Sequence, residues 1–267
     1  MTSPAISVQL YSCRDHLDDL DGTLAKLADI GLRHVEAFSF IDNAPEIAAA
    51  LARHGLTAPT GHAPFLSDEL RFGDQVMPVP PLEAVLSAAK TLGMEWVIDP
   101  FVAHERWTTL EGVQDTARRL NKVAKVAADY GLRVGYHNHT QEIIPQIEGR
   151  TAFEVFADLL DEGVALEVDA FWAGAGGADV PELLKRLGDK VEALHVKNAV
   201  LTGTDAPIEE IVTWPQLPAG EGTLPMAEII AAAPSARFVV IEFDSYDGYV
   251  FDGIKDSYNF LAGLGLS

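Results

Sequence analysis

Short apolar runs alternate with longer amphipathic segments from one end of the chain to the other. A strand that is buried on both faces reads as a nearly continuous run of Val, Ile, Leu and Ala, and each run of this kind here is four to six residues long. The pattern predicts eight β-strands, at residues 6–11, 34–38, 58–62, 96–99, 134–137, 165–169, 191–196 and 238–242.

The segments between these runs carry apolar residues three or four positions apart, which predicts amphipathic helices. They cover residues 17–30, 44–54, 82–92, 110–130, 152–160, 180–187, 226–233 and 254–264. Thr108 and Glu111 have the spacing of a capping box, and Asp179 and Glu182 form a close variant of it. Glycines follow four of the helical segments, as helix C-caps commonly do: Gly31, Gly55, Gly93 and Gly131.

Strands that alternate with helices indicate right-handed βαβ units and a parallel sheet. Eight such units predict an α/β fold, a (β/α)8 TIM barrel in which residues 1–267 form a single domain. An open, doubly wound sheet is the alternative, although its Gly-x-Gly-x-x-Gly motif does not follow the first strand. Two long connections, 63–80 and 197–224, are candidate lids, because long loops after barrel strands border the active site.

Polar side chains stand at the ends of the last four predicted strands: His137, Asp169, His195 and Glu242. A buried charge or imidazole is costly unless it is paired or binds a metal. For any one of them, a hydrogen-bonded core residue is an equally good explanation, but four on successive strands favour one shared site. Two imidazoles and two carboxylates suit a divalent ion such as Mn, Co or Mg, with Zn as a further candidate.

Further polar residues lie close to these four in the sequence. Glu142 follows His137 by five positions and is a candidate metal ligand or acid/base, with a solvated loop carboxylate as the equal alternative. His139 lies one layer above His137 and would face a substrate. His62 closes the third strand and is a candidate to carry a proton or bind a hydroxyl group. Lys197 would stabilise a developing oxyanion, or form a salt bridge to a ligand carboxylate.

The two-residue period of a strand determines which other side chains share a face with these candidates. Glu167 shares the face of Asp169, and Lys197 shares the face of His195. Glu36, inside the second strand, is another residue that is suited to bind a sugar hydroxyl or to carry a proton.

Composition limits the classes of partner. The chain has 267 residues, of which 48% are hydrophobic, and its net charge is −21 from 40 acidic and 19 basic residues. Such an excess of negative charge argues against nucleic acid and against anionic membranes. Cys13 is the only cysteine, which excludes an intrachain disulfide and fits a cytoplasmic location. The first residues show no signal-peptide pattern, and no apolar stretch reaches the length of a membrane span.

Taken in order, a series of short motifs resembles the sugar phosphate isomerase/epimerase family, also described as xylose isomerase-like TIM barrels. The motifs cover nearly the whole chain: Val8-Gln-Leu-Tyr-Ser12, Gly31-Leu-Arg-His-Val-Glu36, Gly61-His62, Gly135-Tyr-His-Asn-His139 with Glu142, Leu166-Glu-Val-Asp169, Leu194-His-Val-Lys197, Gly220-Glu-Gly222 and Ile241-Glu-Phe-Asp244.

The resemblance implies a barrel with one divalent metal held by Glu, Asp, His and Glu on strands five to eight. Asp169, His195 and Glu242 match the last three ligands. The first ligand position departs from the family, because His137 ends strand five and Glu142 lies downstream. Either of these two residues would complete the metal site.

The resemblance also implies an enzyme of carbohydrate metabolism, an isomerase or epimerase of a sugar or keto-sugar. A proton next to a carbonyl would be moved through a metal-stabilised enediolate, with Glu242 and Glu142 as the proton carriers and His137 or His139 as substitutes. A dehydratase, a lyase acting on a keto-sugar or inosose, would use the same metal site. A non-catalytic sugar-binding barrel is a third reading. The expected partner is a small sugar or keto-sugar. Binding to nucleic acid or to a membrane is not expected, and formation of a homo-oligomer is left as an alternative.

Overall fold

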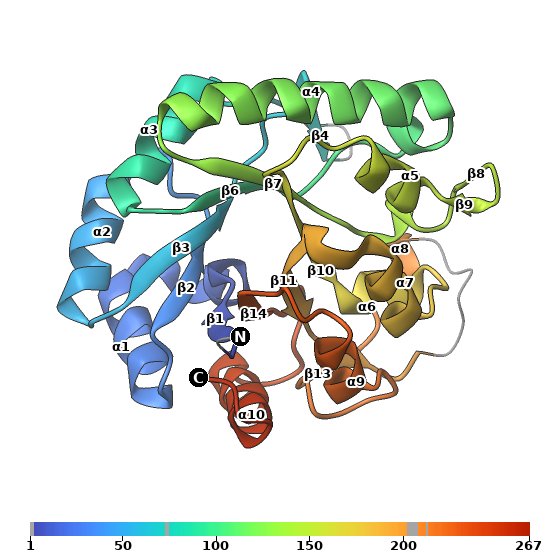
Figure 1. The fold of residues 1–267 in the computed structure, drawn as a ribbon. Coiled ribbons are helices and arrows are strands. Elements are labelled where there is room, and N and C mark those ends of the chain that lie inside the picture. Colours follow the sequence, from blue (N-terminus) through green and yellow to red (C-terminus); the bar gives the residue numbers. More distant parts are fainter. Residues whose placement is uncertain (1–2, 73–74, 202–207, 212) are drawn as a thin grey trace.

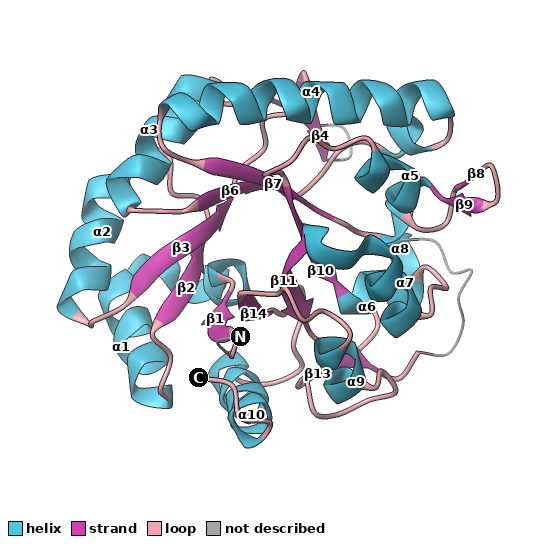
Figure 2. Cartoon of the chain, viewed as in Figure 1, coloured by secondary structure: helices cyan, strands magenta, loops and turns pink. Residues whose placement is uncertain are grey.

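Eight parallel strands form a barrel in the structure, a computed structural model that describes residues 3–72, 75–201, 208–211 and 213–267 (Figures 1 and 2). The strands neighbour one another in the order β1-β14-β11-β10-β7-β6-β3-β2, and a parallel bridge between Gln9 and Glu36 joins the two ends of this series. The prediction of a TIM barrel is therefore confirmed, and the open sheet is wrong. The strands are β1 (Ala5–Val8), β2 (His34–Ala37), β3 (Thr57–His62), β6 (Trp96–Asp99), β7 (Arg133–His137), β10 (Ala165–Asp169), β11 (Val191–Val196) and β14 (Phe238–Ile241).

Helices surround the barrel and cover the outer face of the strands (Figure 2). The outer ring contains α1 (Leu20–Ile30), α2 (Ala44–Arg53), α3 (Leu82–Leu92), α4 (Leu110–Asp129), α5 (Ala152–Asp158), α7 (Val180–Leu187), α9 (Met226–Ala231) and α10 (Val250–Gly263). The described ends of the chain lie side by side, since the Ile6 backbone N–H donates to the Ser267 carbonyl at 3.1 Å. The last helix therefore closes the ring next to the first strand.

Local chemistry explains where several helices begin and end. Asp179 accepts a hydrogen bond from the Glu182 backbone N–H, as expected for the cap of α7. The prediction for α4 is wrong by one residue: Thr109, and not Thr108, accepts from the Gly112 backbone N–H and forms the cap. The Thr108 hydroxyl instead donates to the Glu105 carbonyl, because Thr108 ends a short 3-10 turn before the helix.

The floor of the barrel is apolar. A separate cluster of buried residues shares the inward direction of the site residues but lies earlier on the strands: Trp96, Ile98, Ala165, Ala193, Phe238 and Val240. Gly135 belongs to the same layer, where an added Cβ would lie 2.9 Å from the Ala165 carbonyl oxygen. The close approach of the neighbouring strand's backbone therefore leaves no room for a side chain at this position, and the apolar layer separates the polar residues from the lower end of the barrel.

Predicted and observed boundaries differ most at the two ends of the chain. The first strand ends at Val8 and not at residue 11, because the Gln9 side chain accepts from the Tyr11 backbone N–H and caps a 3-10 helix, η1 (Leu10–Asp19). The first α-helix therefore begins at Leu20 and not at residue 17. The last helix begins at Val250, four residues before the predicted start.

Small elements that the hydrophobic pattern does not predict occupy the connections. They are β4 (Glu69–Phe72), β5 (Gln75–Pro78), η2 (His104–Trp107), η3 (Thr140–Glu142), β8 (Gln146–Ile147), β9 (Arg150–Thr151), α6 (Ala170–Ala175), η4 (Gly188–Lys190), β12 (Asn198–Ala199), α8 (Ile208–Ile211) and β13 (Gln216–Leu217). Parts of the two candidate lids, residues 73–74, 202–207 and 212, lie outside the described residues. A lid function for these connections stays a prediction.

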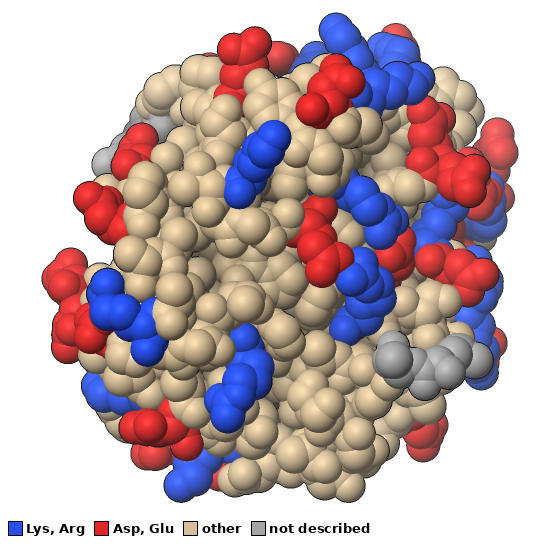
Figure 3. All heavy atoms as spheres, turned by 60° about the vertical axis from the view of Figure 1, so that its left-hand side comes forward, with Lys and Arg blue, Asp and Glu red and all other residues tan. Residues whose placement is uncertain are grey.

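The exterior carries charges of both signs. On the face drawn in Figure 3, Lys and Arg side chains lie between Asp and Glu side chains over a largely uncharged surface. Across the described ranges, no helix combines the length and the apolar character that crossing a membrane requires.

Candidate functional site

The four predicted strand-end residues meet at the C-terminal end of the barrel. His137 ends β7, Asp169 ends β10, His195 lies near the end of β11, and Glu242 directly follows β14. Each offers a ligand atom, these atoms all lie within 4.8 Å of one another, and all four residues are buried. The structure thus places two imidazoles and two carboxylates in one compact group.

Asp169 is held in place by its own backbone surroundings. Its Oδ1 accepts from the Trp172 backbone N–H at 2.8 Å and so caps α6, while its own N–H donates to Asn138 Oδ1 at 3.0 Å. Its other oxygen, Oδ2, lies toward His137, His195 and Lys197. One carboxylate oxygen therefore orients the residue, and the second is available to the site.

Lys197 places a positive charge among the carboxylates. Its Nζ lies 2.9 Å from Asp169 Oδ2 and 2.8 Å from Asp244 Oδ2, and it also donates to Glu242 Oε2. Burial lowers the pKa of this amine, but the surrounding carboxylates outweigh that effect and raise the pKa of Lys197 well above its usual value. Of the two roles considered for Lys197, the salt bridge to the candidate ligands Asp169 and Glu242 is present in this structure.

His195 presents one ring nitrogen to each of two carboxylates. Its Nδ1 lies 2.9 Å from Glu242 Oε2, and its Nε2 lies 2.7 Å from Glu36 Oε1. Glu36 in turn accepts from Gln9 Nε2 at 2.7 Å. Such a series resembles the carboxylate–histidine pairs that orient metal-binding imidazoles. Gln9 was not predicted, and Glu36 was considered only as a sugar-binding or proton-carrying residue.

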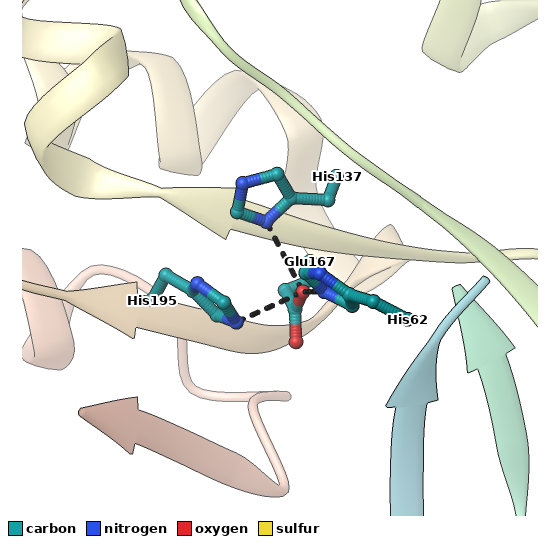
Figure 4. A group of neighbouring side chains, drawn as sticks. All are labelled: His62, His137, Glu167 and His195. Carbon is teal, nitrogen blue, oxygen red and sulfur yellow. Dashed lines mark hydrogen bonds and ion pairs between the residues drawn. The ribbon is translucent and has the colours of Figure 1, made fainter. Parts of the chain in front are cut away.

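His62 joins the site through Glu167. His62 Nε2 lies 2.6 Å from Glu167 Oε2, and His137 Nδ1 lies 3.1 Å from the same oxygen (Figure 4). Burial lowers the pKa of His62, yet Glu36 and Glu167 outweigh it and raise the pKa to about 10. Glu167 was not predicted as a site residue. The signal that would have found it is its position two residues before Asp169, on the same face of β10.

Glu142 does not lie among the four clustered residues. It is buried in η3, where its carboxylate accepts from the Tyr136 hydroxyl and from the His139 backbone N–H, both at 2.7 Å. Its side chain thus stabilises the turn that carries His139, and the structure does not bring it to the other candidate ligands.

His139 faces the mouth of the barrel between two aromatic rings. The centre of its ring lies 5.2 Å from that of Trp172 and 6.0 Å from that of Phe101. Within the described part of the chain its Nδ1 has no hydrogen-bond partner. Burial lowers the pKa of His139 to about 4, so the ring is neutral near pH 7 and able to accept a proton.

Glu142 is expected to make stability depend on pH. Burial raises its pKa from 4.5 to about 7. Between these values the folded protein keeps a proton that the unfolded chain has released, so the free energy of unfolding falls as pH rises, by about 3 kcal/mol in total. Glu142→Gln should remove this loss, since an amide does not titrate. Denaturant unfolding at about pH 5 and pH 8 measures the difference, and identical pH dependence of variant and wild type would contradict it.

The surroundings of the four clustered side chains fit a divalent cation. Their atoms supply two nitrogen and two oxygen ligands, a set that suits Mn, Co or Zn and is usable by Mg. The partners already described fix the orientation of Asp169 and His195 before any ion binds. Two features oppose a cation. The Lys197 ammonium group contacts the same oxygens. Burial lowers the pKa of His195, but Glu167, Glu242 and Glu36 outweigh it and raise that pKa well above its usual value, so the ring must lose a proton to bind an ion.

Comparison with known proteins gives a consistent family and fold. Residues 24–262 match the family described as xylose isomerase-like TIM barrel. An inosose dehydratase from Clostridium perfringens is 27% identical over 148 residues, which cover 55% of this chain and 46% of that protein. The alignment therefore spans about half the length of this curated relative.

Two solved structures share the fold over nearly their whole length. A sugar phosphate isomerase/epimerase from Parabacteroides distasonis superimposes with a TM-score of 0.70 at 17% identity, covering 98% of this chain and 94% of the other. The IOLI protein, which was solved with a bound zinc atom, gives a TM-score of 0.73 at 15% identity and covers 97% of each chain. The resemblance found in the motifs is confirmed, and the chain belongs to the xylose isomerase-like TIM barrel family.

Proposed function

We propose that this protein is a metal-dependent isomerase or epimerase of a sugar or keto-sugar. The observation that carries the proposal is the group formed by His137, Asp169, His195 and Glu242, whose ligand atoms lie within 4.8 Å of one another. Active sites of TIM-barrel enzymes lie at the C-terminal end of the strands, which is where this group is found.

In the proposed reaction, Asp169, His195 and Glu242 would hold the cation, and His137 would complete its ligands. A divalent cation bound there would act as a Lewis acid toward a carbonyl and a neighbouring hydroxyl oxygen of the sugar. Lys197 contributes a second positive charge, because its Nζ lies 2.9 Å from Asp169 Oδ2 and beside Glu242. We assign to this ammonium group the stabilisation of negative charge that develops on the substrate oxygen.

Two groups that follow different strands, β14 and β7, are suited to move the proton. Glu242 comes from β14 and keeps 7% of its side chain exposed, while His139 comes from the loop after β7 and has an unpartnered Nδ1. Epimerisation needs a base on each face of the carbon, and these two residues come from separate strands. Glu142 then acts as a positioning residue, because its carboxylate holds the backbone of His139.

A dehydratase of a keto-sugar or inosose is the second candidate, favoured by the 27% identity to an inosose dehydratase. Glu242 or His139 would remove the same proton, and a general acid would protonate the departing β-hydroxyl. His62 is suited to that task, because nearby carboxylates keep its imidazole cationic and 9% of its side chain is exposed.

The deciding experiment is incubation of the purified protein, loaded with Mn or Co, with a panel of ketoses and inososes in deuterated water. An isomerase or epimerase incorporates deuterium at the carbon next to the carbonyl and keeps the mass of the substrate skeleton. A dehydratase loses one water molecule. Absence of deuterium incorporation and of water loss with every compound, together with measurable sugar binding, would contradict both and favour a sugar-binding barrel.

A further inference from the structure

Lys197 and a cation at the proposed site would compete for the same two oxygens. The Lys197 Nζ lies 2.9 Å from Asp169 Oδ2 and also contacts Glu242 Oε2, and both carboxylates belong to the four clustered residues. Lys197 and Asp169 are fully buried. A buried ammonium group that loses its partners is left with an uncompensated charge, which is strongly destabilising. A cation therefore needs Lys197 to have another partner.

Asp244 is such a partner. Its Oδ2 lies 2.8 Å from Lys197 Nζ, so this contact is already made while Lys197 also contacts Asp169 and Glu242. Asp244 lies two positions after Glu242, keeps 22% of its side chain exposed, and is not one of the clustered residues that offer a ligand atom in the described part of the chain. An ammonium group has three hydrogens. Lys197 is thus able to release two oxygens and keep the third.

The contact with Asp169 is the one that Lys197 satisfies least. Asp169 Oδ2 is buried and has no hydrogen-bond partner within the described ranges, although Lys197 Nζ lies 2.9 Å away, so this contact lacks the direction of a hydrogen bond. The same oxygen lies 3.8 Å from His137 Nε2 and 3.9 Å from His195 Nδ1. A carboxylate oxygen without a hydrogen bond beside two imidazoles is suited to a cation, and Lys197 holds it by charge alone.

Gln216 holds Asp244 in place from another side. The Gln216 Nε2 donates to Asp244 Oδ2 at 2.9 Å, and the Asp244 backbone N–H donates back to Gln216 Oε1 at 2.8 Å. Arg14 Nη2 donates to the Asp244 backbone carbonyl at 2.7 Å. Gln216 is buried, so water does not compete for these bonds. The carboxylate of Asp244 therefore has a fixed position before any ion binds.

Lys197 and Gln216 are joined by one small antiparallel pair of strands. Lys197 directly precedes β12, and Gln216 begins β13, where Ala199 stands opposite Gln216 and Asn198 stands opposite Leu217. The amine and the residue that orients its third acceptor are thus carried by the same pair of strands. This arrangement keeps Lys197 next to Asp244 whether or not the other two oxygens are available.

We propose that Asp244 is the positioning residue that keeps Lys197 beside the site when a cation binds to Asp169 and Glu242, an inference that rests on the metal site of the proposed function. The ammonium group would give up the oxygens of Asp169 and Glu242 and keep Asp244 Oδ2. Its positive charge would then lie next to the ion instead of in the ion's place, where it is able to stabilise a developing oxyanion.

A double-mutant cycle on metal affinity tests the proposal. Calorimetric titration at one pH gives the Kd for Mn of metal-free wild type, Asp244→Asn, Lys197→Met and the double variant. Asp244→Asn removes the partner that Lys197 needs in the metal-bound state, while Asp169 and Glu242 still serve Lys197 in the metal-free state. We expect the Kd to rise by roughly 10–100-fold, the range for residues that support a metal site from outside its ligands. In the Lys197→Met background, the same change should raise the Kd much less.

Two further variants separate this effect from a general loss of charge or order. Asp247→Asn is the matched control, because Asp247 is exposed in the same loop, so the Kd should stay near the wild-type value. Gln216→Met should raise the Kd in the same direction as Asp244→Asn but by less, since the Asp244 carboxylate remains and loses only its orienting bonds.

The possible results distinguish this inference from the proposed function. An equal rise in Kd in both backgrounds would mean that Asp244 acts through its charge alone, which overturns the inference and leaves the metal site intact. Absence of Mn binding by wild type would overturn both. If Lys197→Met does not fold, a crystal structure of the Mn complex decides. We expect Lys197 Nζ to contact Asp244 Oδ2 and neither Asp169 nor Glu242, and an ammonium group that keeps those two contacts, or leaves Asp244, contradicts the proposal.

Discussion

Glu242→Gln is expected to lower turnover by about 10²–10⁴-fold, the range for loss of a general acid or base, and to reduce the metal content of the protein. Glu242 Oε2 contacts both His195 Nδ1, at 2.9 Å, and Lys197 Nζ. The neutral amide keeps the shape of the side chain but cannot carry the negative charge that a cation and a proton both require. Steady-state rates and elemental analysis of the same preparation measure the two losses.

Glu192→Gln is the matched control for this change. Glu192 lies near the start of β11, toward the N-terminal end of the barrel, and pairs with Arg133 on β7. Residues at that end contribute to stability and not to chemistry in TIM barrels, so turnover and metal content should stay near the wild-type values. If Glu242→Gln retains both its metal and its turnover, then Glu242 has neither of the proposed roles, and the ligand positions must be assigned again.

The barrel was predictable because a parallel strand buried on both faces has a continuous apolar run as its signature. The same signature makes a polar residue inside a run conspicuous, which is how Asp169 and His195 were found. The 3-10 helix η1 was not predictable in this way, because its start depends on one hydrogen bond from the Tyr11 backbone to the Gln9 side chain. Hydrophobic periodicity does not register such a contact.

The inner part of the site was harder to predict, because its contacts join distant segments. His195 reaches Glu36, which lies 159 positions earlier in the chain, and His62 reaches Glu167, 105 positions later. The period of a single strand shows which face a residue shares, but not which residue of another strand stands at the same height. The register between neighbouring strands determines which residues stand at the same height in the barrel, and the sequence of one strand does not contain this register.

Glu142 shows a different limit of the sequence. Its position five residues after His137 is compatible with a ligand that reaches back to the metal. In the structure, the His139 backbone N–H and the Tyr136 hydroxyl both donate to the Glu142 carboxylate and turn it away from the clustered ligands. This arrangement depends on the 3-10 turn η3 of three residues, which is too short to produce a periodic pattern.

Lys197→Met is expected to make the stability of the protein depend on metal. In the metal-free state Lys197 is the buried ammonium group that contacts Asp169, Glu242 and Asp244, and methionine fills a similar volume without the charge. Removing one partner of a buried ion pair leaves uncompensated charge and typically costs about 3–5 kcal/mol. Chelator-treated Lys197→Met should therefore lose roughly this amount of its free energy of unfolding, measured by urea denaturation.

Lys185→Met separates this effect from a general loss of charge. Lys185 pairs with Glu182 at 2.6 Å on α7, but 59% of its side chain is exposed, so its removal should leave the free energy of unfolding nearly unchanged. Saturating Mn should then stabilise Lys197→Met more than it stabilises wild type, because in the variant the cation no longer competes with an ammonium group for the oxygens of Asp169 and Glu242. Equal stabilisation of the two proteins by Mn, with no loss in the metal-free variant, would mean that Lys197 does not occupy the place of a cation. The charge of the site would then have to be balanced by protonation of its carboxylates.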